Sequence, residues 1–523
     1  MKNKNIFFLL LCVQLVQAFI VCIGVDSMED ISYPIKRIQL QLSEKANQSD
    51  FSYVYPEQSQ YFSTDIAQGI NDMANYAVSN GYILRFRRGK EYVINQYINI
   101  PVNLVVDLNG ATITRNYDKT QYPTIRLGGN NVIYGGTING NQSNIPDAST
   151  NFINYADIWT RGDNIKIHDI YIHDSTGECI RVDSNNVDIY NCTFGRALDH
   201  QIYMKPSNVG TESFANIHIW DNKFIDNVTT RELLKVADGF DNVLIEGNYF
   251  EVAIGWLITC DNSPNGGNNG TIRVKNNTGK CLYFSEVSNS TSNGLMTSEI
   301  VFEKNRATIL GAGKILKCPF DSTSDTRNGF YVGILKYIEN SFSCSDSSVY
   351  IPIIIDSISA NLIEFEGNTI DYRVSGSTTL IKMIGVVGIF RFRNNLILSP
   401  TKTYSEYSNV FMQLVFPATG VVGGANCKTI LFKKNIFLNT VSPLLNDLAS
   451  NTVSAFLWDM LFYNNNFLDA GGNVRLVNIS STATNSKTIT KKVIASKNYN
   501  RGGDIKSAGI YNTSMIATDV LPL

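Results

Sequence analysis

Apolar and polar residues follow one nine-residue pattern that recurs along most of the chain. Its clearest copies are NIHIWDNKF at 216–224 and NVLIEGNYF at 242–250. Apolar residues at the second and fourth positions alternate with other residues, which is the period of a strand with one buried face. Asn at the seventh position is predicted to be the turn residue, because it tolerates a left-handed backbone and its side chain can bond locally. The aromatic residue at the ninth position returns to the core.

The recurrence of this pattern predicts a repeat architecture. The Asn position falls at Asn109, Asn222, Asn248, Asn277, Asn305, Asn340, Asn368, Asn395, Asn435, Asn465 and Asn498, and three further copies carry Thr137, Ile170 and Cys192. The mean repeat of about 30 residues is typical of solenoids. The alternation by two excludes a two-helix repeat, and one strand phrase per repeat excludes a propeller blade. The pattern therefore predicts an all-β parallel β-helix of about 14 coils.

The coil phrase and its stacked Asn ladder resemble the right-handed parallel β-helix superfamily of pectate lyases, related polysaccharide lyases and hydrolases, and phage tailspikes. The resemblance covers roughly residues 61 to 500. It implies a single-stranded right-handed parallel β-helix solenoid that acts on, or binds, polysaccharide. The Asp-Asp pair, Gly-His-Gly and Arg-Ile-Lys of polygalacturonase-like hydrolases are not in this sequence. The resemblance therefore indicates the fold and leaves the reaction open.

The two ends of the chain differ from the repeats. Residues 1–24 predict a secretory signal peptide, with Lys2 and Lys4 before an apolar run and a cleavage site at 16–18 or 22–24. An uncleaved membrane anchor is the alternative, whereas cleavage predicts a secreted protein without stable membrane insertion. Residues 25–60 are an N-terminal extension and 501–523 a C-terminal cap or tail.

A helix is predicted at residues 65–79, ahead of the first repeats. Ile66, Ile70 and Met73 share one face with two alanines, Asp65 or Thr64 can cap the start, and Gly81 ends the helix. The helix and the strings YILRFRRGKEYVI and YINIPVNLVVDLNGATI resemble the amino-terminal entrance of tailspike-like and pectate-lyase-like β-helices. Its expected role is to cover the open strand edges of the first coil.

Composition narrows the classes of partner. A net charge of −2 and 17% charged residues provide no basic footprint for nucleic acid. Seven cysteines follow the signal segment, and an odd number without close pairs argues against a disulfide framework. Carboxylates such as Asp183 and Asp199 could ligate calcium, but no dense acidic ligand set is present. We therefore predict no cofactor and no metal site, and the oligomeric state is left open.

Candidate chemistry concentrates on coils three to five, where all four histidines fall between 168 and 218. Four strings align there as second strands of successive coils: YADIWTR (155–161), GECIRVD (177–183), DHQIYMK (199–205) and RELLKVA (231–237). The alignment predicts an outward column of Trp159, Arg181, Tyr203 and Lys235, and a second of Arg161, Asp183, Lys205 and Ala237. Glu178, His200 and Glu232 lie ahead of the strands, with Asp199 and Arg231 beside them. Neighbouring coils are one strand spacing apart, so these side chains are expected to form one patch.

The residue types of this patch suit an acidic glycan. Trp159 and Tyr203 offer faces for sugar rings, and Arg161, Arg181, Lys205, Lys235 and Arg231 can hold acidic groups, with His168 and His173 as further binding candidates. For β-elimination the candidates are Arg181, Lys235 or His200 as base and Tyr203 as acid. For hydrolysis the candidates are the carboxylates of Glu178, Glu232, Asp183 and Asp199.

A plainer interpretation is that outward strand positions are polar in any case and that the stacked charges are cross-strand ion pairs. Three hypotheses follow. The first is a secreted enzyme that cleaves an acidic polysaccharide by elimination or hydrolysis in a groove on coils 3–5. The second is a carbohydrate-binding or adhesive β-helix without catalysis, and the third is a structural surface rod.

Overall fold

The computed structural model describes residues 52–117, 122–145, 156–207, 212–225, 232–259, 267–287, 296–318, 330–349, 351–355, 358–375, 379–383, 386–400, 411–415, 427–439, 445–448, 458–468, 474–479, 490–501 and 505–506. The predicted signal segment lies outside these residues, as do most of the N-terminal extension and of the C-terminal tail. Within the described residues, no helix is long and apolar enough to cross a membrane.

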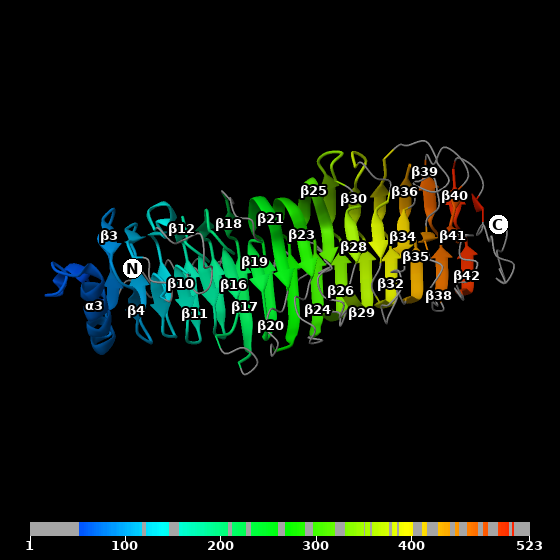
Figure 1. Cartoon of the computed structure of the whole chain (residues 1–523). Helices are drawn as coiled ribbons and strands as arrows, with labels where there is room; N and C mark the ends of the chain where they lie inside the picture. The colour runs from blue at the N-terminus through cyan, green and yellow to red at the C-terminus, as the bar shows by residue number, and fades with distance from the viewer. Residues whose placement is uncertain are drawn as a thin grey trace, which may run out of the picture.

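All strand pairings in the described residues are parallel, and the chain coils along one axis with its first and last coils at opposite ends of a rod (Figure 1). One strand of each coil joins a 16-stranded sheet, here called sheet A. Its strands are β1 (Tyr53–Val54), β2 (Ile83–Arg85), β5 (Val105–Asp107), β8 (Val132–Tyr134), β11 (Ile165–His168), β14 (Val187–Tyr190), β17 (Phe214–Trp220), β20 (Phe240–Glu246), β22 (Asn269–Lys275), β24 (Met296–Glu303), β26 (Phe330–Ile338), β29 (Ile358–Glu366), β32 (Val386–Arg393), β35 (Cys427–Lys433), β38 (Trp458–Tyr463) and β42 (Thr490–Ser496).

The remaining strands form two rows that share one 26-stranded sheet. The first row follows sheet A along the chain: β3 (Glu91–Ile94), β6 (Thr112–Arg115), β9 (Thr137–Asn139), β12 (Tyr171–His173), β15 (Thr193–Phe194), β18 (Lys223–Phe224), β21 (Tyr249–Thr259), β23 (Thr278–Val287), β25 (Arg306–Cys318), β27 (Ser341–Cys344), β30 (Thr369–Asp371), β33 (Leu396–Leu398), β36 (Ile436–Leu438), β39 (Asn466–Leu468) and β43 (Tyr499–Asn500). The second row comes next: β4 (Ile98–Ile100), β7 (Ile125–Leu127), β10 (Ile158–Thr160), β13 (Ile180–Val182), β16 (Ile202–Met204), β19 (Leu234–Val236), β28 (Ile353–Ile355), β31 (Ile381–Met383), β34 (Met412–Val415), β37 (Leu445–Leu448) and β41 (Val477–Ile479).

The two rows merge in the middle of the rod. There β21, β23 and β25 are long strands whose first halves pair in the first row and whose second halves pair in the second row. The sixteen strands of sheet A are separated by fifteen steps of about 4.8 Å, which gives a rod of roughly 70 Å. A short pair, β40 (Val474–Arg475) and β44 (Ile505–Lys506), lies near the end.

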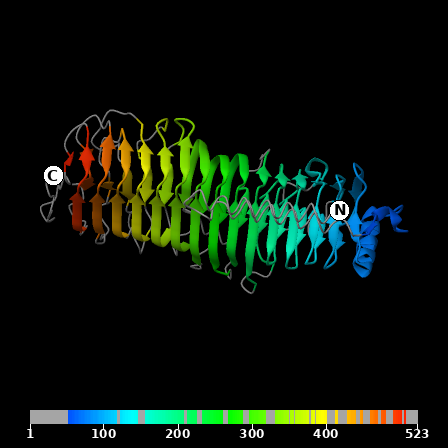
Figure 2. The same cartoon turned by 180° about the vertical axis from the view of Figure 1, so that it is seen from behind.

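The helix α3 (Ile66–Asn80) lies across the first coil, as the sequence predicts (Figure 2). The Asp65 carboxylate accepts a hydrogen bond from the Gln68 amide at 3.0 Å, and Gly81 ends the helix at φ 68°. Before the helix, β1 already pairs in parallel with β2, and a 3₁₀ turn (Pro56–Gln58) follows it. The described coil therefore begins ahead of residue 61, within the stretch that the sequence analysis assigns to the extension. A second 3₁₀ turn covers Gln142–Asn144.

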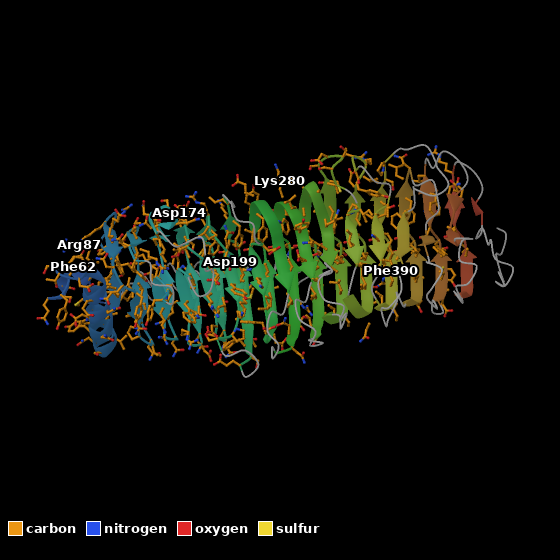
Figure 3. All side chains as sticks on the ribbon, viewed as in Figure 1. Phe62, Arg87, Asp174, Asp199, Lys280 and Phe390 are labelled. Atoms are coloured by element: carbon orange, nitrogen blue, oxygen red, sulfur yellow. The ribbon has the colours of Figure 1, made fainter. Side chains whose placement is uncertain are left out.

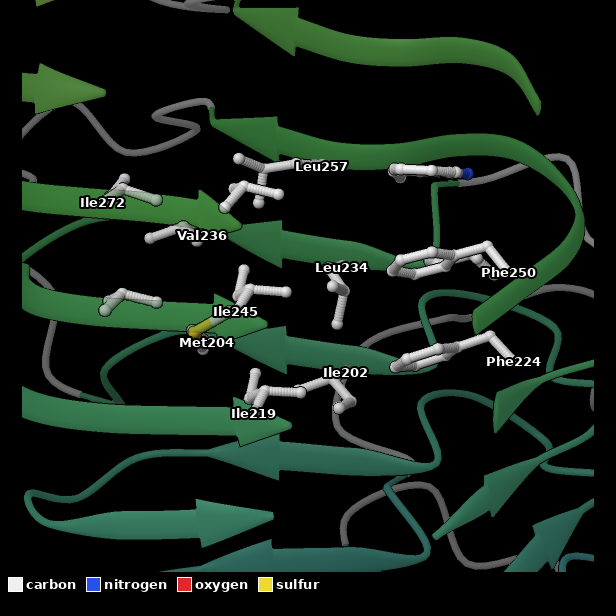
Figure 4. Close-up of a cluster of buried hydrophobic side chains, with 14 of the residues drawn as sticks. Ile202, Met204, Ile219, Phe224, Leu234, Val236, Ile245, Phe250, Leu257 and Ile272 are labelled. Atoms are coloured by element: carbon white, nitrogen blue, oxygen red, sulfur yellow. The ribbon is translucent and has the colours of Figure 1, made fainter. Parts of the chain in front are cut away.

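The core consists of stacked copies of the same inward positions. Ile202, Met204, Leu234 and Val236 of the second row meet Ile219 and Ile245 of sheet A and a column of aromatic rings (Figure 4). The rings of Phe194, Phe224 and Phe250, from the ninth position of the pattern, stack at 4.9 and 4.8 Å. Each fully buried phenyl ring contributes about 1.5–3 kcal/mol. Five buried cysteines are unbridged, namely Cys179, Cys192, Cys281, Cys318 and Cys344.

The asparagines of the pattern are joined in series by hydrogen bonds. Side-chain amides donate to the side-chain oxygen of the next coil at 2.8–3.1 Å, and also to a backbone carbonyl of the preceding coil. The series contains Asn222, Asn248, Asn277, Asn305, Asn340, Asn368, Asn395, Asn435, Asn465 and Asn498. Because these side chains are buried, they supply partners to backbone groups at the turn that water does not reach.

Three details of the predicted turn are wrong. The left-handed residue precedes the buried Asn, as at Asp221 (φ 53°) before Asn222, because the Asn must point inward to reach the next coil. In the early coils the positions equivalent to the buried asparagines are Ala111 and Gly136. The backbone carbonyl of Asn222 accepts from the Tyr249 amide, and in the same way Ala111 accepts from Thr137 and Gly136 from Tyr171. Asn109 and Thr137 therefore lie beside the column and not in it.

A second column of asparagines lies on the surface at the turn before sheet A. Their side-chain amides bond in series, and each backbone has a φ between 48° and 67°. The members are Asn103, Asn130, Asn164, Asn186, Asn216 and Asn242. They stand at the first position of the nine-residue pattern, as Asn216 and Asn242 do in its two clearest copies, and the sequence analysis gave that position no role.

Candidate functional site

The predicted outward column of the second row is confirmed by strand pairing. Trp159 is the partner of Arg181, Arg181 of Tyr203, and Tyr203 of Lys235, on β10, β13, β16 and β19. The inward neighbours Ile158, Ile180, Ile202 and Leu234 are buried in the core, which orients the alternate residues outward. The four side chains therefore come from four successive coils at one strand spacing.

Tyr203 lies at the centre of this column among cationic side chains. Lys235 Nζ lies 5.0 Å from the ring centroid, Lys205 Nζ 5.8 Å and the Arg181 guanidinium 6.0 Å. Arg181 also lies 5.2 Å from the Trp159 ring. Although they point outward, Arg181, Tyr203 and Lys235 are only 6, 7 and 6% exposed, so charges here act with little screening by water.

Two glutamates precede strands of this row. Glu178 is buried, and burial with the nearby Asp199 charge raises its pKa to about 7, although Arg181 and Lys205 oppose the shift. Burial also raises the pKa of Glu232, helped by the charge of Glu286. A raised pKa keeps a carboxyl group protonated closer to neutral pH, which is the state that a general acid requires.

His200 joins two carboxylate-bearing turns. Its Nδ1 donates to the backbone carbonyl of Glu232 at 2.7 Å, and its Nε2 lies 3.5 Å from Asp199 Oδ1. The ring also lies 5.2 Å from that of Tyr203. Asp199 and Glu232 thus belong to successive coils and are tied through one buried imidazole (Figure 3 places Asp199 on the blue-green coils).

Asp183 occupies a different environment from the other predicted carboxylates. It pairs with Arg161 at 2.6 Å, accepts from the Trp159 indole at 3.3 Å and accepts from the Ser207 amide at 2.9 Å. The Ser207 hydroxyl also bonds to it. These contacts hold the Trp159 and Arg161 side chains in place beside the column.

Other predicted binding residues lie elsewhere. His168, predicted as a binding residue, is on sheet A and is buried between the rings of Tyr134 and Tyr190 at 5.0 and 4.7 Å. Stacking on neighbouring coils explains its burial. His173 lies in the first row, bonded to Asp174 at 2.8 Å. Arg231 lies outside the described residues.

Two ionisable residues that the sequence analysis missed extend the column. Glu286 and Lys317 lie on the second halves of β23 and β25 and form an ion pair at 2.9 Å. Gly255 leaves room for the Glu232 side chain, whose Cγ lies 2.6 Å from where a Cβ of residue 255 would be. Extending the strand alignment by one more coil would have found them, because Ile258 pairs with Lys235 on one side and with Glu286 on the other.

A further buried carboxyl group lies one coil before Glu178. Asp157 immediately precedes β10, where burial raises its pKa to about 7 against the opposing effect of Arg115. Thr124 Oγ1 donates to it at 2.9 Å. Among the described residues, no group of three or more His, Cys, Asp or Glu side chains is arranged to hold a metal ion.

The chain is a right-handed parallel β-helix, and solved structures with the same fold are tailspikes. A mutant tailspike protein of E. coli bacteriophage HK620 matches with a TM-score of 0.50 and 10% sequence identity, over 84% of this chain and 75% of that chain. Another mutant of this tailspike, in complex with a pentasaccharide, matches with a TM-score of 0.49 and 10% identity, over 84% of this chain and 76% of that chain. No protein-family model and no curated protein match the chain. At this identity the likeness shows the fold alone.

Proposed function

We propose that this protein is an enzyme that hydrolyses an acidic polysaccharide at the second row of strands. Glu232 is the proposed general acid, and Asp199 is the proposed general base or nucleophile. The observation that carries the proposal is the link through His200. It ties two carboxylate-bearing turns on successive coils, beside a column of rings and cations. Glycoside hydrolysis needs such a pair of carboxylates in unequal protonation states.

The two carboxyl groups take unequal roles in the proposed reaction. The protonated Glu232 donates its proton to the glycosidic oxygen as the bond to the anomeric carbon breaks. The Asp199 carboxylate either accepts a proton from the attacking water or attacks the anomeric carbon itself. Arg181 and Lys205 lie near the carboxyl group of Glu178 and favour its charged state. Buried cations here also offer binding partners to acidic groups of the substrate.

Hydrolysis is favoured over β-elimination by the contacts of His200. Its Nδ1 carries a proton to a backbone carbonyl, and its Nε2 is directed toward Asp199, so neither nitrogen is directed as a free base toward a sugar. Glu178 is 1% exposed and is proposed to act electrostatically. Asp183 is proposed to position Trp159 and Arg161, since both of its oxygens accept hydrogen bonds.

A glycan is also the ligand in a solved structure with a similar fold. The tailspike of bacteriophage HK620 is described in complex with a pentasaccharide. That tailspike resembles this chain in fold only, so the proposal depends on Glu232, Asp199 and His200 and not on the resemblance. We further propose that residues 1–24 direct secretion, which amino-terminal sequencing of exported protein would test by locating the cleavage site.

The test is a panel of acidic and neutral polysaccharides incubated with the full chain. Reducing ends measure any cleavage, and ultraviolet absorbance of unsaturated uronate ends measures elimination. We expect reducing ends without absorbance, and a loss of at least about 100-fold in Glu232→Gln. The control is Glu246→Gln, which alters another buried glutamate, on sheet A, and should leave turnover unchanged.

Other outcomes would replace the proposal. Absorbance and reducing ends rising together would mean elimination, with Arg181 or Lys235 as base and Tyr203 as acid. Binding of a glycan without any cleavage would mean a carbohydrate-binding or adhesive β-helix. Neither binding nor cleavage by folded protein would leave a structural rod.

A further inference from the structure

Four aromatic rings stack on the outer face of sheet A. They are strand partners on successive coils, namely Tyr134 on β8, His168 on β11, Tyr190 on β14 and Trp220 on β17. Their ring centroids lie 5.0, 4.7 and 4.4 Å apart, so each ring covers a face of the next. We call these four residues the aromatic ladder. Because the ring faces are used within the ladder, the edges are directed away from the sheet, and they offer no surface on which a sugar ring could stack.

The edges of the ladder are covered along one narrow line. Tyr190 and Trp220 are only 2 and 3% exposed, although both alternate with inward isoleucines and therefore point outward. The outward residues two positions earlier on the ladder strands are half-buried, and the turn residues after those strands are half-buried or exposed. These flanking residues are Lys166, Asp188 and His218, and Asp169, Asn191 and Asp221. A cover one extended chain wide, parallel to the rod axis, accounts for burial that is confined to the ladder.

The coils supply no segment at this position. β11 ends at His168 and β12 begins at Tyr171, so the chain passes from the ladder into the first row through a turn of two residues. β14 and β15, and β17 and β18, are joined in the same way. Between residues 112 and 338, every stretch outside the described residues follows a strand of the first or second row. Those stretches leave the coil at its other two corners and not at the corner beside the ladder.

The described chain begins next to the first ladder residue. Its first strand, β1, places the Tyr53 ring 4.5 Å from the Arg85 guanidinium, and Arg85 pairs with Asp107 at 3.2 Å. Asp107 is in turn the strand partner of Tyr134. Residues 25–51 precede β1, lie outside the described residues and would remain on the chain after cleavage at either predicted signal site.

We infer that residues 36–42 form a strap along the aromatic ladder, with Ile38, Leu40 and Leu42 against the ring edges. These three residues alternate with glutamines in the string KRIQLQL, which is the period of an extended chain with one buried side. From Ile38 to Leu42 an extended chain spans about 13 Å, and the ladder from His168 to Trp220 spans about 10 Å, at two strand spacings.

The connection to β1 has the necessary length. Nine residues, 43–51, lie between the strap and the described chain, and they reach about 30 Å when extended. Trp220 lies six strand steps from β1, which is roughly 29 Å. The connection, SEKANQSDF, is polar up to its last residue, as expected for a segment that crosses the surface.

The charges of the strap and of the ladder's flanks are complementary. Lys36 and Arg37 precede the apolar residues of the strap. The flanking positions carry more acid than base, with Asp169, Asp188 and Asp221 against Lys166. A positively charged strap is therefore attracted to this face of the rod.

The inference is independent of the proposed function. Glu232 and Asp199 precede strands of the second row, whereas the ladder belongs to sheet A. Failure of every glycan assay would leave the strap in place, and failure of the strap would leave the proposed enzyme unaffected.

Cross-linking within the full chain tests the strap. Gln41→Cys places a thiol between two apolar residues of the strap, and Leu244→Cys places one on β20, next to His218 on the neighbouring strand. A short bismaleimide would join them, and proteolysis with mass spectrometry would locate the link. The control pair is Gln41→Cys with Leu431→Cys, because Leu431 is a half-buried leucine in the same outward column, six coils farther along.

We expect at least about tenfold more of the 41–244 link than of the 41–431 link, because the strap holds the first two thiols at a high effective concentration. Gln41→Cys alone measures the background from native thiols. Equal yields of the two links, or a 41–244 link found only between two copies of the chain, would overturn the inference.

A second pair of variants tests which side chains hold the strap. Adding Leu40→Asp and Leu42→Asp should lower the 41–244 link to the level of the control, because carboxylates do not pack against ring edges. Adding Leu40→Val and Leu42→Val should retain most of it. A 41–244 link that survives in the folded Asp variant would refute the packing of these leucines, and if that variant fails to fold, the comparison of the two links decides by itself.

Discussion

The imidazole of His200 donates from Nδ1 to the backbone carbonyl of Glu232 at 2.7 Å. Because a carbonyl oxygen only accepts, Nδ1 must carry the proton, and Nε2 is the nitrogen that faces Asp199 Oδ1 at 3.5 Å. His200 therefore fixes the turn that carries Glu232 relative to the carboxylate of the preceding coil. In the proposed enzyme it is a positioning residue.

Replacing His200 should reduce turnover without removing substrate binding. His200→Phe keeps a ring but loses the donor, and we expect kcat to fall about 10- to 100-fold with KM within about threefold. His200→Asn places an amide donor near Nδ1 and should recover part of kcat. Steady-state kinetics of the three proteins would contradict this role if both variants lost activity equally or if KM alone changed.

The pH dependence of activity should move in opposite directions in two neighbouring variants. Burial raises the pKa of Glu232, the Glu286 charge raises it further, and Lys317 lowers it. A general acid works only while protonated, so activity falls as pH rises through this pKa. Glu286→Gln removes a negative charge and should move the alkaline limb of kcat/KM to lower pH, by roughly 0.5–1 unit.

Lys317→Met is the matched partner of that experiment. It removes a positive charge near the same carboxyl group, so the alkaline limb should move to higher pH. Both pH–rate profiles would be measured under identical salt conditions. Shifts of the same sign would show that Glu232 does not supply the proton.

The buried asparagine column should matter more to stability than the exposed one. Asn305→Ala deletes two hydrogen bonds that its oxygen accepts from Asn277, and two that its amide donates to Val274 and Asn340. The Asn277 backbone amide is then left buried without its acceptor. We expect a loss of about 2–4 kcal/mol in the free energy of unfolding, measured by urea denaturation.

The control is Asn216→Gly in the exposed column. Glycine accepts the φ of 64° at this position, and water can replace the amide hydrogen bonds. The expected loss is under about 0.5–1 kcal/mol. Equal losses in the two variants would argue against a special role for burial.

Because the carboxyl group of Asp157 is buried, we expect the free energy of unfolding to fall as pH rises. Burial raises its pKa in the folded protein to about 7, whereas an unfolded Asp has a pKa of about 3.9. Between these values the folded state binds more protons, so the free energy of unfolding falls as pH rises from about 4 to about 7. The Glu178 carboxyl group, with its pKa also raised to about 7, acts in the same direction.

Asp157→Asn should reduce this decline, because an amide does not titrate. We expect the difference in unfolding free energy between pH 4 and pH 7 to shrink by on the order of 1–3 kcal/mol. Urea denaturation of both proteins at several pH values provides the measurement. A decline as steep as that of the unaltered protein would place the titrating group elsewhere.

Errors of the sequence analysis arose where a residue's environment depends on other coils. His168 has the outward position of its strand, yet it is buried, because rings from two adjacent coils stack on it. Glu286 and Lys317 were missed because their strands are continuous through both rows, which hides the second-row position in the linear pattern. Asn109 was placed in the column although its turn is two residues out of step.

The sequence by itself determined the coil and the register of its second row. Both depend on alternation by two and on a repeat of about 30 residues, which are local properties that stacking at one strand spacing converts directly into neighbours. Only the tertiary structure decided which outward side chains are buried and which charged groups shift the pKa of Glu178 and Glu232. It also decided that His200 contacts both Asp199 and the backbone of Glu232. Those properties depend on turns that vary in length from coil to coil, and on desolvation by groups far apart in the chain, which no local pattern encodes.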